Sequence, residues 1–250
     1  MPISLGGNRV IGLELDDGLA VLTIDRPHAR NAISLATMDE LEKTLEAAAG
    51  ARARALVIRG AGGRAFVSGG DLKELAAIRT EEDAAAMARR MRGICDRIAG
   101  FPAPVVAALN GHALGGGAEV AVAADIRVAA DDIRIGFNQV TLAIMPAWGG
   151  AERLAALVGR GRALMLAGSG AVLDAAEAQR LGLVDQVLPR ASFEEGWRSL
   201  ARSLATGPAG EIKRVLGDDT SPDSAVRAFA RLWAADAHWE AADRAMTRRK

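Results

Sequence analysis

Short apolar runs alternate with amphipathic segments along the first 190 residues of this chain. Residues 10–15 and 19–24 are apolar runs on either side of an Asp-Asp-Gly sequence, which predicts a β-hairpin. Further runs have the length of buried strands, and they cover residues 55–58, 105–109, 126–129 and 183–188. Residues 133–142 are expected to be extended or to form a loop.

Helices are predicted where apolar residues recur every three or four positions. Ser34 can cap one such helix, and its expected buried face is Leu35, Met38, Leu41 and Leu45. Thr80 and Asp174 each precede an acidic residue by three positions, which is the spacing of a capping box. Other helices are expected over 118–124, over 151–158 and along most of the chain from 191 onward.

The alternation of strands and helices favours an α/β fold class. We divide the chain into a core over residues 1–190 and a C-terminal helical region over 191–250. Periodicity by itself fits both a doubly wound sheet and a spiral of β-β-α repeats.

Two glycine-rich turns, about 45 residues apart, each lead into a predicted helix. The first reads Ser68-Gly69-Gly70-Asp71, and the second contains Gly115-Gly116-Gly117. The first N–H groups of a helix have no partner within it, and glycine lets a ligand approach them closely. Two such donors that converge on one carbonyl oxygen form an oxyanion hole. A flexible turn is the alternative for either run alone.

Glu119 follows the second turn and stands among apolar residues on both sides. A helix that is apolar all round is buried, and burial raises the pKa of a carboxyl group. Those properties suit a general acid/base beside an enolate. The alternative is a glutamate that is paired with a cation in the core.

Composition excludes several other kinds of chemistry. Lysine and arginine together equal aspartate and glutamate, 31 each, so the net charge gives no support for binding nucleic acid or an anionic membrane. The three histidines and single cysteine lack metal-ligand spacing, and there is no P-loop, dinucleotide fingerprint or serine-hydrolase elbow. Cys95 is expected to be a buried, unreactive thiol. No signal sequence is recognised, and we expect a cytoplasmic protein.

Five segments in order resemble the crotonase, or enoyl-CoA hydratase/isomerase, superfamily. They are Leu22–Ser34, Ala65–Glu74, Ala107–Glu119, Met145–Leu154 and Ala175–Leu188. The resemblance implies a spiral β-β-α core that carries a CoA-ester site. It also implies C-terminal helices that form homotrimers or dimers of trimers. Acyl-CoA thioesters would be the substrates, with no metal and no cofactor other than the CoA within the substrate.

The resemblance also assigns roles to residues. The N–H groups of Gly70 and Gly116 would bind the thioester oxygen, and Glu119 would transfer the proton. Residues expected to bind substrate or CoA, besides Gly70, are Arg30, Ala32, Ser68, Asp71, Leu72, Lys73, Gly115 and Trp148.

The sequence departs from the family pattern at Gln139, which falls where hydratases carry a second glutamate. An amide cannot exchange a proton at neutral pH, but it can orient a water molecule or a carboxylate. The first interpretation is therefore an enoyl-CoA hydratase-type lyase that works with Glu119 alone and with Gln139 positioning the second reactant. The second is a decarboxylase of malonyl-type thioesters such as ethylmalonyl-CoA. From another class, a catalytically weak acyl-CoA-binding or scaffold protein stays open.

Overall fold

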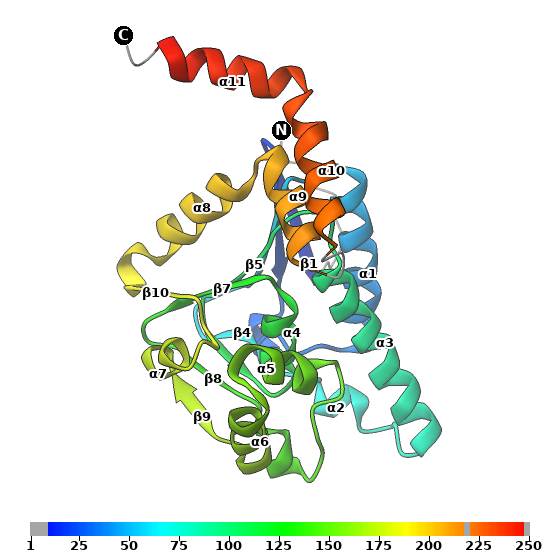
Figure 1. Cartoon of the computed structure of the whole chain (residues 1–250). Coiled ribbons are helices and arrows are strands. Elements are labelled where there is room, and N and C mark those ends of the chain that lie inside the picture. Colours follow the sequence, from blue (N-terminus) through cyan, green and yellow to red (C-terminus); the bar gives the residue numbers. More distant parts are fainter. Residues whose placement is uncertain (1–9, 218–220, 248–250) are drawn as a thin grey trace.

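The computed structural model describes residues 10–217 and 221–247, which form two sheets with helices around them (Figure 1). The larger sheet has the strand order β1-β2-β3-β5-β7-β10. Its strands are β1 (Ile11–Asp16), β2 (Leu19–Ile24), β3 (Ala55–Gly60), β5 (Val105–Leu109), β7 (Ile126–Ala130) and β10 (Gln186–Leu188). Only the hairpin of β1 and β2 is antiparallel, and every other neighbouring pair in this sheet is parallel.

A smaller sheet lies beside the larger one and has the order β4-β6-β8-β9. It contains β4 (Ala65–Val67), β6 (His112–Leu114), β8 (Arg134–Gly136) and β9 (Val172–Asp174). The parallel pair of β4 and β6 matters most for the site, because each of these strands runs directly into one glycine turn. The two turns therefore leave the same edge of one sheet.

Some of the helices between the strands begin with side-chain caps, whereas α4, α5 and α6 follow glycines and have none. Ser34 accepts a hydrogen bond from Thr37 N at the start of α1, and Thr80 and Asp174 cap α3 and α7 in the same way. The helices up to β10 are α1 (Leu35–Gly50), α2 (Leu72–Leu75), α3 (Glu81–Ala99), α4 (Gly116–Ala123), α5 (Gly150–Val158), α6 (Arg160–Ser169) and α7 (Ala175–Arg180). Short 3-10 turns lie at Pro27–Ala29, Asn138–Leu142 and Arg190–Ser192.

Helix α4 is completely buried in the core. All eight of its residues are buried, and it contacts β4, β5, β6, α3 and α5. Cys95, in α3, is also buried, and burial raises the pKa of its thiol to about 12. The hydrophobic core therefore surrounds α4, the helix that carries Glu119.

The C-terminal helices are arranged differently. Helix α8 (Phe193–Leu204) packs on β3 and β7, whereas α9 (Gly207–Leu216), α10 (Pro222–Trp233) and α11 (Asp236–Thr247) lie at one end of the molecule, and α11 points away from it (Figure 1). Large apolar side chains on these last helices are exposed, among them Phe229, Trp233 and Trp239. No helix in the described part of the chain is long and apolar enough to cross a membrane.

Several sequence predictions need correction. Leu35 is 45% exposed, so the buried face of α1 is made by Met38, Leu41, Leu45 and their neighbours. The strand predicted over 183–188 is confined to β10, since Leu183 and Val184 are buried in the turn that follows α7. The expectation of an extended segment or loop at residues 133–142 is confirmed at β8, and the 3-10 turn that follows it was not predicted. Strands of three residues such as β6 and β9 are too short to show an alternation of apolar and polar residues. They can be recognised only by their hydrogen bonds to neighbouring strands.

Candidate active site

The two glycine turns meet. A Cβ built on Gly69 would lie 3.4 Å from Gly116 N and 4.0 Å from Gly116 Cα. Gly69 and Gly115 have φ angles of +102° and +55°, which glycine adopts without steric cost. Within the described residues, neither Gly70 N–H nor Gly116 N–H donates a hydrogen bond to the protein. Two free donors therefore stand in adjoining turns.

The helix prediction at 118–124 is wrong at its start, and the error bears on the site. Helix α4 begins at Gly116, with Gly115 as its N-cap. Gly116 N–H is therefore the first amide of the helix, at the positive end of the helix dipole. Gly115 N in turn donates to Gly136 O at 2.8 Å, which ties the turn to β8.

The first turn is held by a loop from the start of the chain. Ile33 N donates to Gly69 O, and Asp71 N donates to Ile33 O, both at 2.8 Å. The Asp71 carboxylate then caps the short helix α2 by accepting from Lys73 N and Glu74 N. These bonds fix the backbone on both sides of Gly70.

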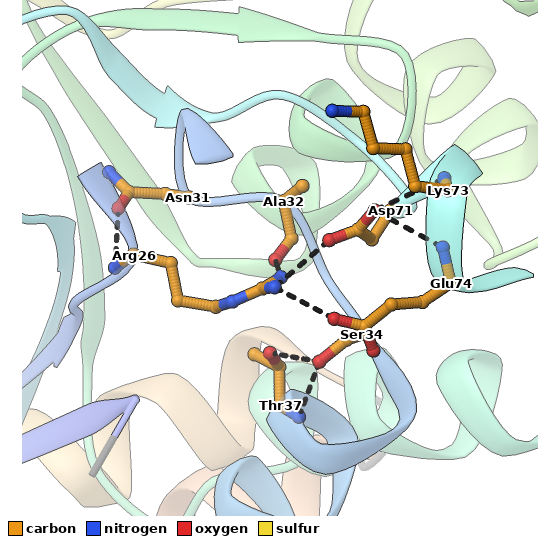
Figure 2. A network of polar contacts seen from close by, with 8 residues as sticks. All are labelled: Arg26, Asn31, Ala32, Ser34, Thr37, Asp71, Lys73 and Glu74. Atoms are coloured by element: carbon orange, nitrogen blue, oxygen red, sulfur yellow. Dashed lines mark hydrogen bonds and ion pairs between the residues drawn. The ribbon is translucent and has the colours of Figure 1, made fainter. Parts of the chain in front are cut away.

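Arg26 organises the charges around this turn (Figure 2). Its guanidinium donates to Ala32 O at 2.6 Å, and to the carboxylates of Asp71 and Glu74 at 2.9 Å each. Burial by itself would raise the pKa of Asp71, but the hydrogen bonds from Arg26 and from Glu74 N–H outweigh it, and the pKa lies below its ordinary value. Asp71 is consequently an ionised cap.

Glu119 is buried beside the second turn, with 2% of its surface exposed. Oε2 accepts from Trp148 N at 2.7 Å and Gly150 N at 3.0 Å, and Oε1 accepts from Gln139 Nε2 at 2.9 Å. Burial raises its pKa above the ordinary value, although these three donors oppose the rise. No cation pairs with Glu119 among the described residues, so the paired-glutamate alternative loses its basis.

Gln139 is also buried, and only half of its amide has a partner. Its Nε2 donates to Glu119, while its Oε1 has no hydrogen-bond partner in the described residues. A buried acceptor without a donor is costly. Such an unpaired acceptor beside the carboxylate is one that a bound water molecule or ligand group would satisfy.

Comparison with known proteins agrees with this geometry. The profile of the family described as enoyl-CoA hydratase/isomerase matches residues 14–235. The chain belongs to the enoyl-CoA hydratase/isomerase family. A probable enoyl-CoA hydratase of Bacillus subtilis is 42% identical over 70% of this chain and 67% of its own length. A short-chain-enoyl-CoA hydratase of Clostridium acetobutylicum is 35% identical over 82% and 78%.

Solved structures show the same relationship. The crystal structure of an enoyl-CoA hydratase from Bacillus anthracis superposes with a TM-score of 0.90 at 31% identity, covering 96% of this chain and 97% of that one. The expected crotonase-type fold and superfamily are confirmed, and the chain is an enzyme of this family. Its α/β core and C-terminal helices are those of the family's fold.

The remaining residues that the sequence assigned to substrate binding fall into separate groups. Arg30 and Ser68 line a cavity of about 500 Å³, together with Leu114, Arg64, His112 and Arg190. Ser68 and Leu114 each stand two residues before one of the free amides, so this cavity adjoins both turns. Arg30 and Arg64 have no ion-pair partner in the described chain. A basic lining of this kind suits a phosphate-bearing ligand.

Leu72 and Lys73 lie elsewhere, on the exposed side of α2. Ala32 is buried, and its carbonyl is occupied by Arg26. Apart from cavity-lining residues such as Arg64, two residues that hold the site were not assigned from the sequence, namely Arg26 and Gly150. Each belongs to a segment that carries the family resemblance, so the signal was present, but the partners that give them a role are distant in sequence.

Proposed function

We propose that the protein hydrates 2-enoyl-CoA thioesters, with the thioester oxygen held between Gly70 N–H and Gly116 N–H. One observation carries the proposal: two unpaired amides in adjoining turns stand next to a buried carboxylate. Donors that are already fixed in place stabilise charge as it develops on an oxygen, without reorganising during the reaction. The family relationship supports acyl-CoA as the ligand.

The reaction balances with Glu119 as the only acid/base. Its carboxylate removes a proton from water while the water oxygen forms a bond to C3. The electron pair of the C2–C3 double bond moves to C2 and the thioester, giving an enolate on the two amides. Glu119 then returns its proton to C2. The raised pKa suits this exchange, since the proton must be both accepted and released.

Gln139 replaces the second carboxylate with a fixed hydrogen-bonding group. Its Nε2 holds Glu119, and its free Oε1 can accept one O–H of the water while Glu119 accepts the other. A carboxylate can only accept hydrogen bonds, which explains why the amide presents Nε2 to Glu119. Water is thereby oriented without a second proton-transfer group.

CoA itself is proposed to lie along the basic cavity, with its phosphates near Arg30 and Arg64. The step needs only donors and one carboxyl group, so the proposal includes no metal or redox cofactor. We further propose a cytoplasmic homotrimer or dimer of trimers, in which a neighbouring copy covers the exposed apolar side chains of α10 and α11.

The test is a parallel assay of crotonyl-CoA hydration and of CO2 release from ethylmalonyl-CoA. We expect hydration of crotonyl-CoA that is lost in Glu119→Gln, and no CO2 release. CO2 release without hydration would replace the proposal with a decarboxylase. Tight binding of both thioesters without turnover would make the protein an acyl-CoA-binding member of the family.

A further inference from the structure

Trp148 contacts both the catalytic carboxylate and the two glycine turns. Its backbone N–H donates to Glu119 Oε2 at 2.7 Å. Its indole lies against Gly116, where an added Cβ would overlap the six-membered ring. The same ring approaches Gly70, where an added Cβ would lie 3.9 Å from Cζ2. The indole therefore spans the two glycines that carry the free amides.

A second apolar group faces Gly70. The Cβ built there would lie 2.9 Å from Leu75 Cδ1, on α2. Leu75 and the indole are thus apolar walls beside the position proposed for the thioester oxygen. The wall made by Trp148 is well fixed, because only 7% of the residue is exposed.

The backbone behind the indole is also restrained. Arg153 donates from Nη1 to Trp148 O at 3.3 Å, and its Nη2 pairs with Asp96 on α3 at 2.5 Å. Retreat of the indole would disturb this link and the amides that hold Glu119. Packed interiors resist such shifts.

We propose that Trp148 selects thioesters whose acyl group is unbranched and uncharged at C2. This inference rests on the proposed function, because it assumes that C1 sits at the two amides. C2 is then one bond from the carbonyl carbon, and the proposal places a substituent on C2 against the indole, which spans both glycines. A carboxylate at C2 would also lose its hydration against an apolar ring, which is unfavourable. A flat, linear enoyl group avoids both problems.

The experiment measures binding without chemistry, so that it does not depend on hydration. Calorimetry gives the affinities of butyryl-CoA, 2-methylbutyryl-CoA and ethylmalonyl-CoA for the full chain and for Trp148→Phe, Trp148→Ala and Trp197→Phe. Trp197 is a matched control, since it is fully buried in α8 and bonds Glu194 there. Trp148→Phe keeps an aromatic ring and guards against loss of folding in the alanine variant.

The full chain should bind butyryl-CoA at least about tenfold more tightly than either C2-substituted ligand. The ratio of the affinity for butyryl-CoA to that for 2-methylbutyryl-CoA should be smaller in Trp148→Phe than in the full chain. It should be about threefold or less in Trp148→Ala, and it should be unchanged in Trp197→Phe. Equal affinities in the full chain, a ratio that Trp148→Ala leaves unchanged, or tighter binding of ethylmalonyl-CoA would each overturn the inference. The crotonyl-CoA assay is separate: no hydration with this binding pattern intact would reject the proposed function and keep the role of Trp148.

Discussion

The two glycine turns present equivalent amides from very different surroundings. The turn at Gly116 opens a helix that is buried along its whole length. The turn at Gly70 opens a four-residue helix with an exposed face, and a guanidinium and two carboxylates hold it in place (Figure 2). Packing positions the amide of Gly116, whereas ion pairs and charged hydrogen bonds position the amide of Gly70. One site can therefore be weakened by quite different substitutions.

Glu119 lies on the buried helix that begins at Gly116, and loss of its carboxylate should reduce the rate of hydration more than any other change. Glu119→Gln keeps the shape but cannot transfer a proton, so kcat for crotonyl-CoA hydration should fall about 10²–10⁴-fold. A spectrophotometric assay of the enoyl thioester measures this. Retained kcat would show that another group performs the proton transfer.

The same variant should be more stable than the parent protein at high pH. Because burial raises the folded-state pKa of Glu119, its contribution to stability is full below the unfolded pKa and is lost as pH rises through the folded pKa. Glu119→Gln removes this loss. Its Tm should exceed the parental Tm at pH 8, and the gap should shrink on acidification. A gap that widens in acid would contradict a raised pKa.

Packing around the second turn should make Gly116→Ala the next most harmful change. The added methyl group overlaps the indole of Trp148, so the amide or the indole must move, and loss of one oxyanion donor costs about 10²–10³-fold in kcat. Ala118→Gly, on the same helix, is the control for a loss of helix stability and core packing that leaves the Gly116 amide unobstructed, at about 1 kcal/mol from helix propensity. Similar kinetics for both variants would contradict a special role for the amide at 116.

At the turn that carries Gly70, Arg26→Ala should lower stability and kcat/KM moderately. Added salt should not have the same effect on the parent protein, because the Arg26–Asp71 pair is largely buried. Arg26→Ala leaves the Asp71 cap without its main partner, and breaking a largely buried pair costs roughly 3 kcal/mol in stability. We expect kcat/KM to fall about tenfold as the amide at Gly70 shifts. Glu74→Gln removes the more exposed pair and should stay within about twofold. Equal effects of Arg26→Ala and Glu74→Gln would contradict the view that the buried pair with Asp71 holds the turn.

The smallest expected change is a shift in the pH dependence of kcat/KM for hydration in Gln139→Leu. Gln139 lowers the pKa of Glu119 through its hydrogen bond, so Gln139→Leu should raise that pKa further. Hydration requires ionised Glu119, and the acid limb of kcat/KM should therefore move to higher pH. Thr141→Val, on the exposed side of the same 3-10 turn, should leave the limb in place. A shift to lower pH would contradict the assigned donor.

The same contrast explains what the sequence could predict. Burial of Glu119 followed from its apolar neighbours, and the caps at Ser34, Thr80 and Asp174 followed from local spacing. These features depend on residues that are close in the chain. The Arg26 network joins positions 45 and more residues apart, and no period or motif encodes that pairing.

The site shows the same limit. The two glycine turns were recognisable, and so was the unusual Gln139, but not the position of the indole across both glycines. Nor could spacing indicate that Trp148 N and Gly150 N would hold Glu119. Such contacts arise where β4 and β6 end side by side, which only the paired sheet defines.

The central claim is that the amides at Gly70 and Gly116 share one thioester oxygen beside Glu119. A crystal structure with acetoacetyl-CoA, whose enolate resembles the proposed intermediate, tests it most directly. The account predicts the thioester oxygen within hydrogen-bonding distance, about 2.7–3.1 Å, of both nitrogens, and C2 next to the Glu119 carboxylate. An oxygen bound to one amide only, or to neither, would contradict it.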